Sequence, residues 1–189
     1  MGMAREGMSD RVTLRPANLD DVALLRRWDR EPHVIAATTD EADAQVAHET
    51  DDWSYELALQ SEAYAYFIAE QDGRPIGAMQ VIDPHAEPTH YWGEIAPNLR
   101  AVDIWIGEVG DLGRGYGEQM MRQMLQRCFA TPEVTAVLID PLTSNIRAHK
   151  FYQRLGFVPQ GRRTFNAGED DCLVHELSRA QWRKQFPGD

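Results

Sequence analysis

Cysteine is scarce in this chain of 189 residues, which contains only Cys128 and Cys172. Two cysteines cannot build a disulfide framework, so the sequence predicts a protein of a reducing compartment, and we expect a cytoplasmic location. Long apolar runs are also missing, because no stretch approaches the roughly 20 residues of a membrane-spanning helix. The N-terminal segment has neither the apolar stretch of a signal peptide nor the Ser or Thr of a myristoylation signal.

Basic residues are outnumbered: 19 Lys and Arg stand against 30 Asp and Glu, giving a net charge of −11 and a pI near 4.9. A protein that neutralises nucleic-acid phosphates or docks on anionic membrane needs a basic face. The charge balance therefore argues against nucleic acid and membrane as partners. The histidines show no metal-ligand spacing and the G-x-S-x-G motif is absent, so we expect no metal site and no serine nucleophile elbow.

The sequence does have enough apolar material for one core, since 43% of its residues are hydrophobic. Its length suits a single domain over residues 11–189, preceded by a flexible tail at residues 1–10. No internal repeat or low-complexity segment interrupts it. Cys128 shares a helix face with Met124, which is typical of a core thiol.

Apolar periodicity and turn signals predict a mixed α/β domain. Strands are expected over residues 12–15, 65–70, 76–82, 102–106, 135–140, 157 onwards and 171–177, with Asp72-Gly73 as a hairpin turn. Helices are expected after the N-cap Asn18 and over residues 52–60, 118–129 and 145–155, the last closed by Gly156. Pro32 is expected to break any helix early in the polar segment 29–52. The predicted order is one strand, one or two helices, four strands, a helix, a strand, a helix and two strands, with irregular or edge structure at 83–100.

A glycine-rich turn, Leu112-Gly113-Arg114-Gly115-Tyr116-Gly117, lies between a predicted strand and a predicted helix. Glycines let the backbone approach an anion, and the helix start offers free N–H donors and a positive dipole end. Alone the pattern is weak, because such turns are more often only turns. It lacks the Gly-Lys-Ser/Thr of a P-loop, and its third glycine comes too early for a dinucleotide fold, although Asp140 fits a ribose-binding position. Acyl-CoA binding is the third interpretation.

The next predicted helix favours that third interpretation. Asn145, Ala148 and Tyr152 recur at spacings of three and four, so they share one face of the helix. The small Ala148, between an amide and a phenol, leaves room for a slender ligand arm along that face. The glycine turn and this helix are far more specific together than either is alone.

With Gly156-Phe157 after the helix, these motifs resemble the Gcn5-related N-acetyltransferase (GNAT) family over roughly residues 12–177. Within the family the chain is most similar to aminoglycoside 6′-N-acetyltransferases. The resembling segments are 103–108, 113–117 and 140–157. One departure is Leu112, where the wider family prefers Gln or Arg. The resemblance implies the acyl-CoA N-acyltransferase fold, a central splayed mixed sheet flanked by helices.

The resemblance also implies an activity: transfer of an acetyl group from acetyl-CoA to a primary amine of a cationic small molecule, by direct attack in a ternary complex. The favoured acceptor is the 6′-amine of an aminoglycoside antibiotic, which would make the protein a resistance enzyme. Alternatives are another acceptor (a siderophore precursor, a polyamine or a protein amine) or a sensor that binds acyl-CoA without turnover. Siderophore-type relatives tend to carry His where this chain has Asp103, which favours the aminoglycoside branch.

Two residues are the candidate catalytic groups. Tyr152 suits donation of a proton to the leaving sulfur, because its reference pKa of about 10 keeps the phenol protonated. Asp103 matches the acid proposed as base or amine anchor in the aminoglycoside enzymes. A carboxylate with a pKa of about 4 is a poor base for an ammonium, so orienting the amine is the more plausible role. The alternative, non-catalytic interpretations are a buried aromatic side chain for Tyr152 and a solvent-exposed charge for Asp103.

The coenzyme is expected to thread between the strands at 103–107 and 135–140, with the Ile106 N–H holding the thioester carbonyl. The residues expected to bind it are Trp105, Ile106, Gly113, Arg114, Gly115, Tyr116, Gly117, Glu118, Asn145, Ala148 and Tyr152.

The acceptor is expected in a negatively charged pocket. Acidic runs at 40–52 and 169–171 are usually solvated loops, but beside a coenzyme site they would steer a polycation. The residues expected to bind the acceptor are Trp92, Glu94, Asp103, Asp140 and Asp171, with Trp92 stacking on sugars or amines. The chain is expected to be a monomer or a homodimer, since Trp182 and Phe186 could pair chains or pack on their own domain.

Overall fold

The computed structural model describes residues 11–47, 52–165, 168 and 170–188. Within these residues the chain forms one seven-stranded sheet in the order β1-β2-β3-β4-β5-β7-β6. Neighbouring strands pair antiparallel, except that β4 and β5 pair parallel. The strands are β1 (Val12–Pro16), β2 (Tyr64–Gln71), β3 (Arg74–Ile82), β4 (Leu99–Ile106), β5 (Ala136–Ile139), β6 (Val158–Phe165) and β7 (Asp170–Ser178). The predicted mixed α/β class is confirmed.

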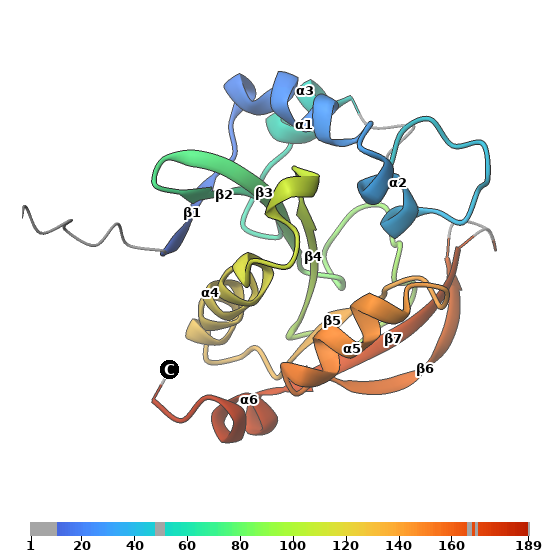
Figure 1. The fold of residues 1–189 in the computed structure, drawn as a ribbon. Coiled ribbons are helices and arrows are strands. Elements are labelled where there is room, and N and C mark those ends of the chain that lie inside the picture. The colour runs from blue at the N-terminus through green and yellow to red at the C-terminus, as the bar shows by residue number, and fades with distance from the viewer. Residues whose placement is uncertain (1–10, 48–51, 166–167, 169, 189) are drawn as a thin grey trace, which may run out of the picture.

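Helices cover both faces of this sheet (Figure 1). The α-helices are α1 (Val22–Trp28), α2 (Pro32–Thr38), α3 (Trp53–Ala58), α4 (Tyr116–Ala130), α5 (Ile146–Arg154) and α6 (Arg179–Gln185). Short 3-10 helices η1 (Leu19–Asp21) and η2 (Val109–Asp111) precede α1 and α4.

The two faces follow the alternation of side chains along the strands. Phe67 and Ala69 of β2 belong to a core shared with α4, α5 and α6. Their neighbours Tyr66 and Ile68 belong to the opposite core, which is shared with α1 and α3. On that second face, a third cluster seats the loop between β3 and β4 over β5, β6 and β7, with Trp92 in its centre.

Three expectations about the elements are corrected. Pro32 does not break a helix but begins α2, because proline at the first helical position needs no N–H partner and its fixed φ suits the helix. Three strands, not four, lie between α3 and α4, since residues 83–98 are irregular. An additional helix, α6, follows β7, capped by Ser178 and Gln181. The predicted tail at residues 1–10 lies outside the described residues.

The aromatic C-terminal segment packs on its own domain. Trp182 is buried and stacks on Phe129 of α4 with ring centroids 5.8 Å apart. Phe186 packs on Trp182, at 4.5 Å between centroids. Across the described residues, no helix has both the length and the apolar character that crossing a bilayer requires.

The sheet splays open in its middle, as expected. β4 and β5 are in register only at Leu99 with Ala136, Arg100 with Val137, and Ala101 with Leu138. β4 continues to Ile106 while β5 ends at Ile139, so in the described chain the two strands diverge beyond these pairs. The divergence leaves the inner edge of β4 open between the two halves of the sheet.

Candidate active site

Two adjoining cavities occupy the gap between β4 and β5. Cavity 1 has a volume of about 350 Å³ and lies on the side of the loop between β3 and β4. Cavity 2 has a volume of about 910 Å³ and reaches the start of α4. The residues that line both are Ala37, Ile104, Trp105, Asn145, Ala148 and Tyr152. A ligand that extends through cavity 2 would therefore meet cavity 1 at Tyr152.

The glycine-rich turn forms one wall of cavity 2. Gly113 and Gly115 have φ of 75° and 80°, the left-handed region that glycine adopts without strain. A Cβ on either would meet no described atom within 4 Å, so their surface is open. Gly115 is the N-cap of α4, and the residues of the first turn, Tyr116 to Glu118, line the cavity. The turn therefore offers helix N-terminal N–H groups and a positive dipole end to an anion.

An ion pair anchors this turn to the β2–β3 hairpin. Arg74 donates two hydrogen bonds to the buried Asp111, at 2.7 and 2.9 Å. The guanidinium holds the pKa of the Asp111 carboxyl below its usual range. Of the predicted turn residues, Arg114 is exposed and lies outside the cavity lining, whereas Leu112 belongs to it.

The inner edge of β4 presents backbone groups to the gap. The Gly107 N–H donates to the Ile76 carbonyl at 2.9 Å, so the backbone N–H and C=O groups of Gly107 and Trp105 point towards β3. Because backbone groups alternate along an antiparallel ladder, those of Ile104 and Ile106 point the other way, into the gap. His33 of α2 contacts the Ile106 carbonyl oxygen at 2.8 Å through Nε2, which brings α2 against the opening. The Ile106 N–H therefore faces the gap, as a donor to a thioester carbonyl would need to.

Tyr152 projects from α5 to the junction of the two cavities. Its ring packs against Phe157 and His175, at 5.9 and 6.2 Å between centroids. Burial raises the pKa of the phenol, and the negative charges of Asp103 and Asp140 raise it further. Its hydroxyl forms no hydrogen bond with another described residue, so the site contains a protonated donor that is not already engaged.

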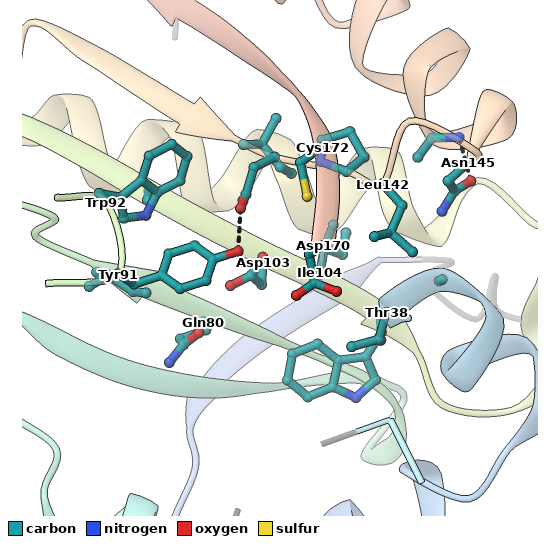
Figure 2. Close-up of a pocket in the computed structure, with 18 of the residues that line it drawn as sticks. Thr38, Gln80, Tyr91, Trp92, Asp103, Ile104, Leu142, Asn145, Asp170 and Cys172 are labelled. Atoms are coloured by element: carbon teal, nitrogen blue, oxygen red, sulfur yellow. Dashed lines mark hydrogen bonds between the residues drawn. The ribbon is translucent and has the colours of Figure 1, made fainter. Parts of the chain in front are cut away.

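Carboxylates line cavity 1 from both sides of the gap (Figure 2). Asp103 comes from β4, Asp140 follows β5, and Asp170 comes from β7. Burial raises the pKa of Asp140 to about 7, and the neighbouring charge of Asp103 contributes to that rise. The Tyr91 hydroxyl donates to Asp140 Oδ2 at 2.8 Å. This concentration of acidic groups suits a cationic ligand.

Asn145 has a structural role as well as a place in the site. It is the N-cap of α5, and its Oδ1 accepts from the Ala148 N–H at 3.1 Å. Both residues also line the two cavities, as expected from their shared helix face. The predicted coenzyme residues Trp105 and Ile106 line cavity 2 as well.

Of the residues predicted to bind the acceptor substrate, only some line cavity 1. Trp92 lines cavity 1, but it is 1% exposed because Phe165 packs against it at 5.3 Å, which leaves little face for a sugar. Glu94 is exposed in a turn outside the lining. Asp171 pairs with Arg162 of β6 and points away, because successive residues of β7 face opposite sides. Its neighbour Asp170 takes the expected place.

Of the acidic run at 40–52, the described residues 40–47 and 52 line neither cavity. Asp40 accepts from the Ser144 hydroxyl at 2.7 Å and ties the end of α2 to the loop before α5. Asp52 caps α3 and pairs with Arg26. Glu49, Asp51 and Glu169 lie outside the described residues.

Several site residues were missed by the sequence reasoning. Tyr91 lies in the segment 83–100, for which only irregular or edge structure was expected, and helix α2 was not expected at all. Three exposed cations on α5, spaced by three and four residues, line cavity 2: Arg147, Lys150 and Arg154. Their spacing on one helix face, in a chain of net charge −11, was a signal that could have identified them.

Within the described part of the chain, no group of three His, Cys, Asp or Glu side chains is arranged to hold a metal ion.

A splayed mixed sheet, a glycine turn at a helix start and an unengaged phenol define an acyl-CoA transferase architecture. The family model of the acetyltransferase (GNAT) domain matches residues 18–165. The chain therefore belongs to the GNAT acetyltransferase family, and the predicted family and fold are confirmed.

The chain is similar to named members of one branch of that family. It is 30% identical to aminoglycoside N(6′)-acetyltransferase type 1 of Serratia marcescens, over 94% of this chain and 89% of the relative. The enzyme of the same name from Klebsiella pneumoniae is also 30% identical, over 88% and 83%. The solved structure of AAC(6′)-Ib with ribostamycin and coenzyme A superposes with a TM-score of 0.77 at 29% identity, covering 93% of this chain and 97% of that one. The predicted resemblance to aminoglycoside 6′-N-acetyltransferases is confirmed.

Proposed function

We propose that this protein transfers the acetyl group of acetyl-CoA to the 6′-amine of an aminoglycoside antibiotic. The observation that carries the proposal is the meeting of two unlike cavities at one phenol. Cavity 2 offers helix N–H groups and cations to the phosphates of a coenzyme, and cavity 1 offers carboxylates to a polycation. Tyr152 lies where the thioester and the amine would meet.

The coenzyme fits cavity 2 on charge and on shape. The first turn of α4 would bind the pyrophosphate, while Arg147, Lys150 and Arg154 supply positive charge along the same wall. The part beside Ala148, which lines both cavities, would take the thioester arm. The Ile106 N–H would then bind the carbonyl oxygen, whose negative charge grows as the amine attacks.

The reaction needs one proton removed and one supplied. Asp103 orients the acceptor amine and takes its proton as the new C–N bond forms at the thioester carbon. As the C–S bond breaks, the Tyr152 hydroxyl donates its proton to the leaving sulfur. The raised pKa of Tyr152 keeps that proton in place until the sulfur becomes basic. Asp140 and Asp170 hold further ammonium groups of the acceptor.

The proposal is tested by release of free coenzyme A thiol from acetyl-CoA and the purified protein. The acceptors are two aminoglycosides that differ only at the 6′ position, neomycin with an amine and paromomycin with a hydroxyl. We expect turnover with neomycin and little with paromomycin. Turnover only with polyamines or other small amines would contradict the acceptor, and tight coenzyme binding without any turnover would indicate a sensor.

A further inference from the structure

Tyr91 is fixed in place by the loop that carries it. The loop between β3 and β4 folds around Glu87, whose side chain is buried at 3% exposure. The Glu87 carboxylate accepts from the Tyr91 N–H at 2.6 Å and from the Thr89 N–H at 2.7 Å. It also accepts from the Thr89 hydroxyl at 2.5 Å. A buried carboxylate with three donors rigidifies the loop, so the backbone of Tyr91 is held.

The ring of Tyr91 is fixed as well. It stacks on Phe165 of β6, with centroids 4.5 Å apart and an angle of 7° between the planes. Trp92 meets it edge-on at 6.0 Å. The hydroxyl therefore points in one direction, to Asp140 Oδ2 at 2.8 Å, as the dashed line in Figure 2 shows.

Asp140 has acidic or neutral surroundings in the described structure. The titratable groups that face it are Asp103 of β4, Tyr91 of the loop, Tyr152 of α5, and Asp170 and Cys172 of β7. These groups include no cation, and two of them repel its negative charge. The Tyr91 hydroxyl is therefore the side chain among them that stabilises the ionised carboxylate.

We propose that Tyr91 is a positioning residue for the acceptor, whose hydroxyl holds the Asp140 carboxylate on the β5 side of the gap, facing Asp103 across it. The inference rests on the proposed function, because the held carboxylate is what a cationic acceptor would bind. Without the hydroxyl, Asp140 loses both its fixed orientation and a donor that favours its charge. Its pKa would then rise above about 7, and the carboxyl would be neutral at neutral pH.

The variant that tests this is Tyr91→Phe, which keeps the stack on Phe165 and removes only the hydroxyl. At slightly acidic and neutral pH, we expect the KM for the aminoglycoside to rise about tenfold, the usual scale for a hydrogen bond to a charged group. At alkaline pH, where Asp140 is ionised in both proteins, the difference shrinks. The KM for acetyl-CoA stays unchanged. The matched control is Tyr55→Phe on α3, an exposed tyrosine outside both cavities, which leaves all values unchanged.

Two further measurements separate positioning from a general structural role. In an Asp140→Asn background, Tyr91→Phe adds no further loss, because its effect passes through that carboxylate. A ¹³C NMR titration of the Asp140 carboxyl, assigned with Asp140→Asn, shows a higher pKa in Tyr91→Phe than in the unmodified protein. The titration needs no acceptor, so it tests the inference even where no aminoglycoside is acetylated, a result that would defeat only the proposed function. A loss that does not depend on pH, an equal loss in the Asn background, or an unchanged titration would overturn the inference.

Discussion

Tyr152 combines two properties at the scale of a single residue: it is buried, and it borders both cavities. Burial and two nearby carboxylates raise its pKa, so ionisation of the free enzyme's phenol does not compete with its role as a donor. Burial is the main reason why the pKa of Asp140 reaches about 7, and repulsion from the neighbouring Asp103 raises it further. The site thus holds an acid that keeps its proton and a carboxyl that titrates near neutrality.

Replacing Tyr152 by Phe is expected to lower kcat by about 100-fold, the lower range for loss of a general acid. The ring still packs against Phe157 and His175, so the fold and the KM for acetyl-CoA change little. Steady-state thiol release, with circular dichroism as the check on folding, measures both. An unchanged kcat would contradict the role of Tyr152 as the proton donor to the leaving sulfur.

The sequence predicted the individual residues unevenly, and strand geometry explains the difference. The spacing of the helix motif fixes the face on which Tyr152 lies. Asp140 was expected from its place at the end of a predicted strand, and Asp103 from the resemblance to the family. Asp171 was chosen from an acidic run in which nothing in the sequence set the register, and a one-residue error in a strand reverses the face. Glu94 lies in irregular structure, where no periodicity exists to indicate direction.

At the scale of elements, the start of α4 and the exposed row of cations on α5 form two of the walls of cavity 2, beside α2 and β4. The α4 wall was predictable because the glycine turn, weak as a signal alone, is followed by a helix with a matching motif at 145–152. Helix α2 was not, since Pro32 has two opposite meanings: it disrupts a helix interior but favours a first turn. In the structure Glu31 is the N-cap, so Pro32 takes the first position of α2 and favours the helix. The sequence alone does not show where the helix begins.

Gly115→Ala is expected to weaken the binding of acetyl-CoA. At φ of 80°, alanine costs about 1–2 kcal/mol in backbone strain and would tilt the first N–H groups of α4 away from the anion. Isothermal titration calorimetry with acetyl-CoA measures the change, expected to be about tenfold in Kd. Gly110→Ala in the preceding 3-10 helix is the matched control, because a Cβ there meets no described atom within 4 Å and Gly110 has no positive φ. Equal effects in the two variants would argue against the role given to Gly115.

The cations of α5 give a second prediction at this scale. Changing Arg147, Lys150 and Arg154 together to Ala is expected to raise the KM for acetyl-CoA several-fold and to flatten its dependence on ionic strength, because three positive charges leave the coenzyme wall. Removing Arg183 and Lys184 from α6, exposed and outside both cavities, changes neither quantity. A rise of the same size in the control would point to overall charge instead of a local wall.

At the scale of the whole molecule, ionisation of Asp140 lowers the free energy of unfolding, although the proposed function needs the ionised carboxylate. Its pKa is raised from 3.8 to about 7 in the folded chain, so between these values the native state binds more protons than the unfolded state. The free energy of unfolding therefore falls as pH rises through this window. Asp140→Asn removes the effect while its amide oxygen can still accept from Tyr91.

We expect Asp140→Asn to raise Tm relative to the unmodified protein at alkaline pH and to have little effect near pH 4. A gain of at least about 1 kcal/mol corresponds to roughly 2–4 °C for a chain of this size. Differential scanning fluorimetry across the window tests it, and a Tm difference that is constant with pH would contradict it. Activity towards a polycationic acceptor falls in the same variant, so the carboxylate is retained at a cost in stability.

The seam between β4 and β5 has a consequence for motion. Three registered pairs connect the half-sheet β1–β4 to the half-sheet β5–β7, so local opening starts where that ladder ends. Amide hydrogens of Ile104 and Ile106 then exchange with solvent deuterium faster than those in the middle of β3. A coenzyme that spans the seam would join the half-sheets into one cooperative unit. Local opening at the seam would then be slowest in the enzyme with bound coenzyme.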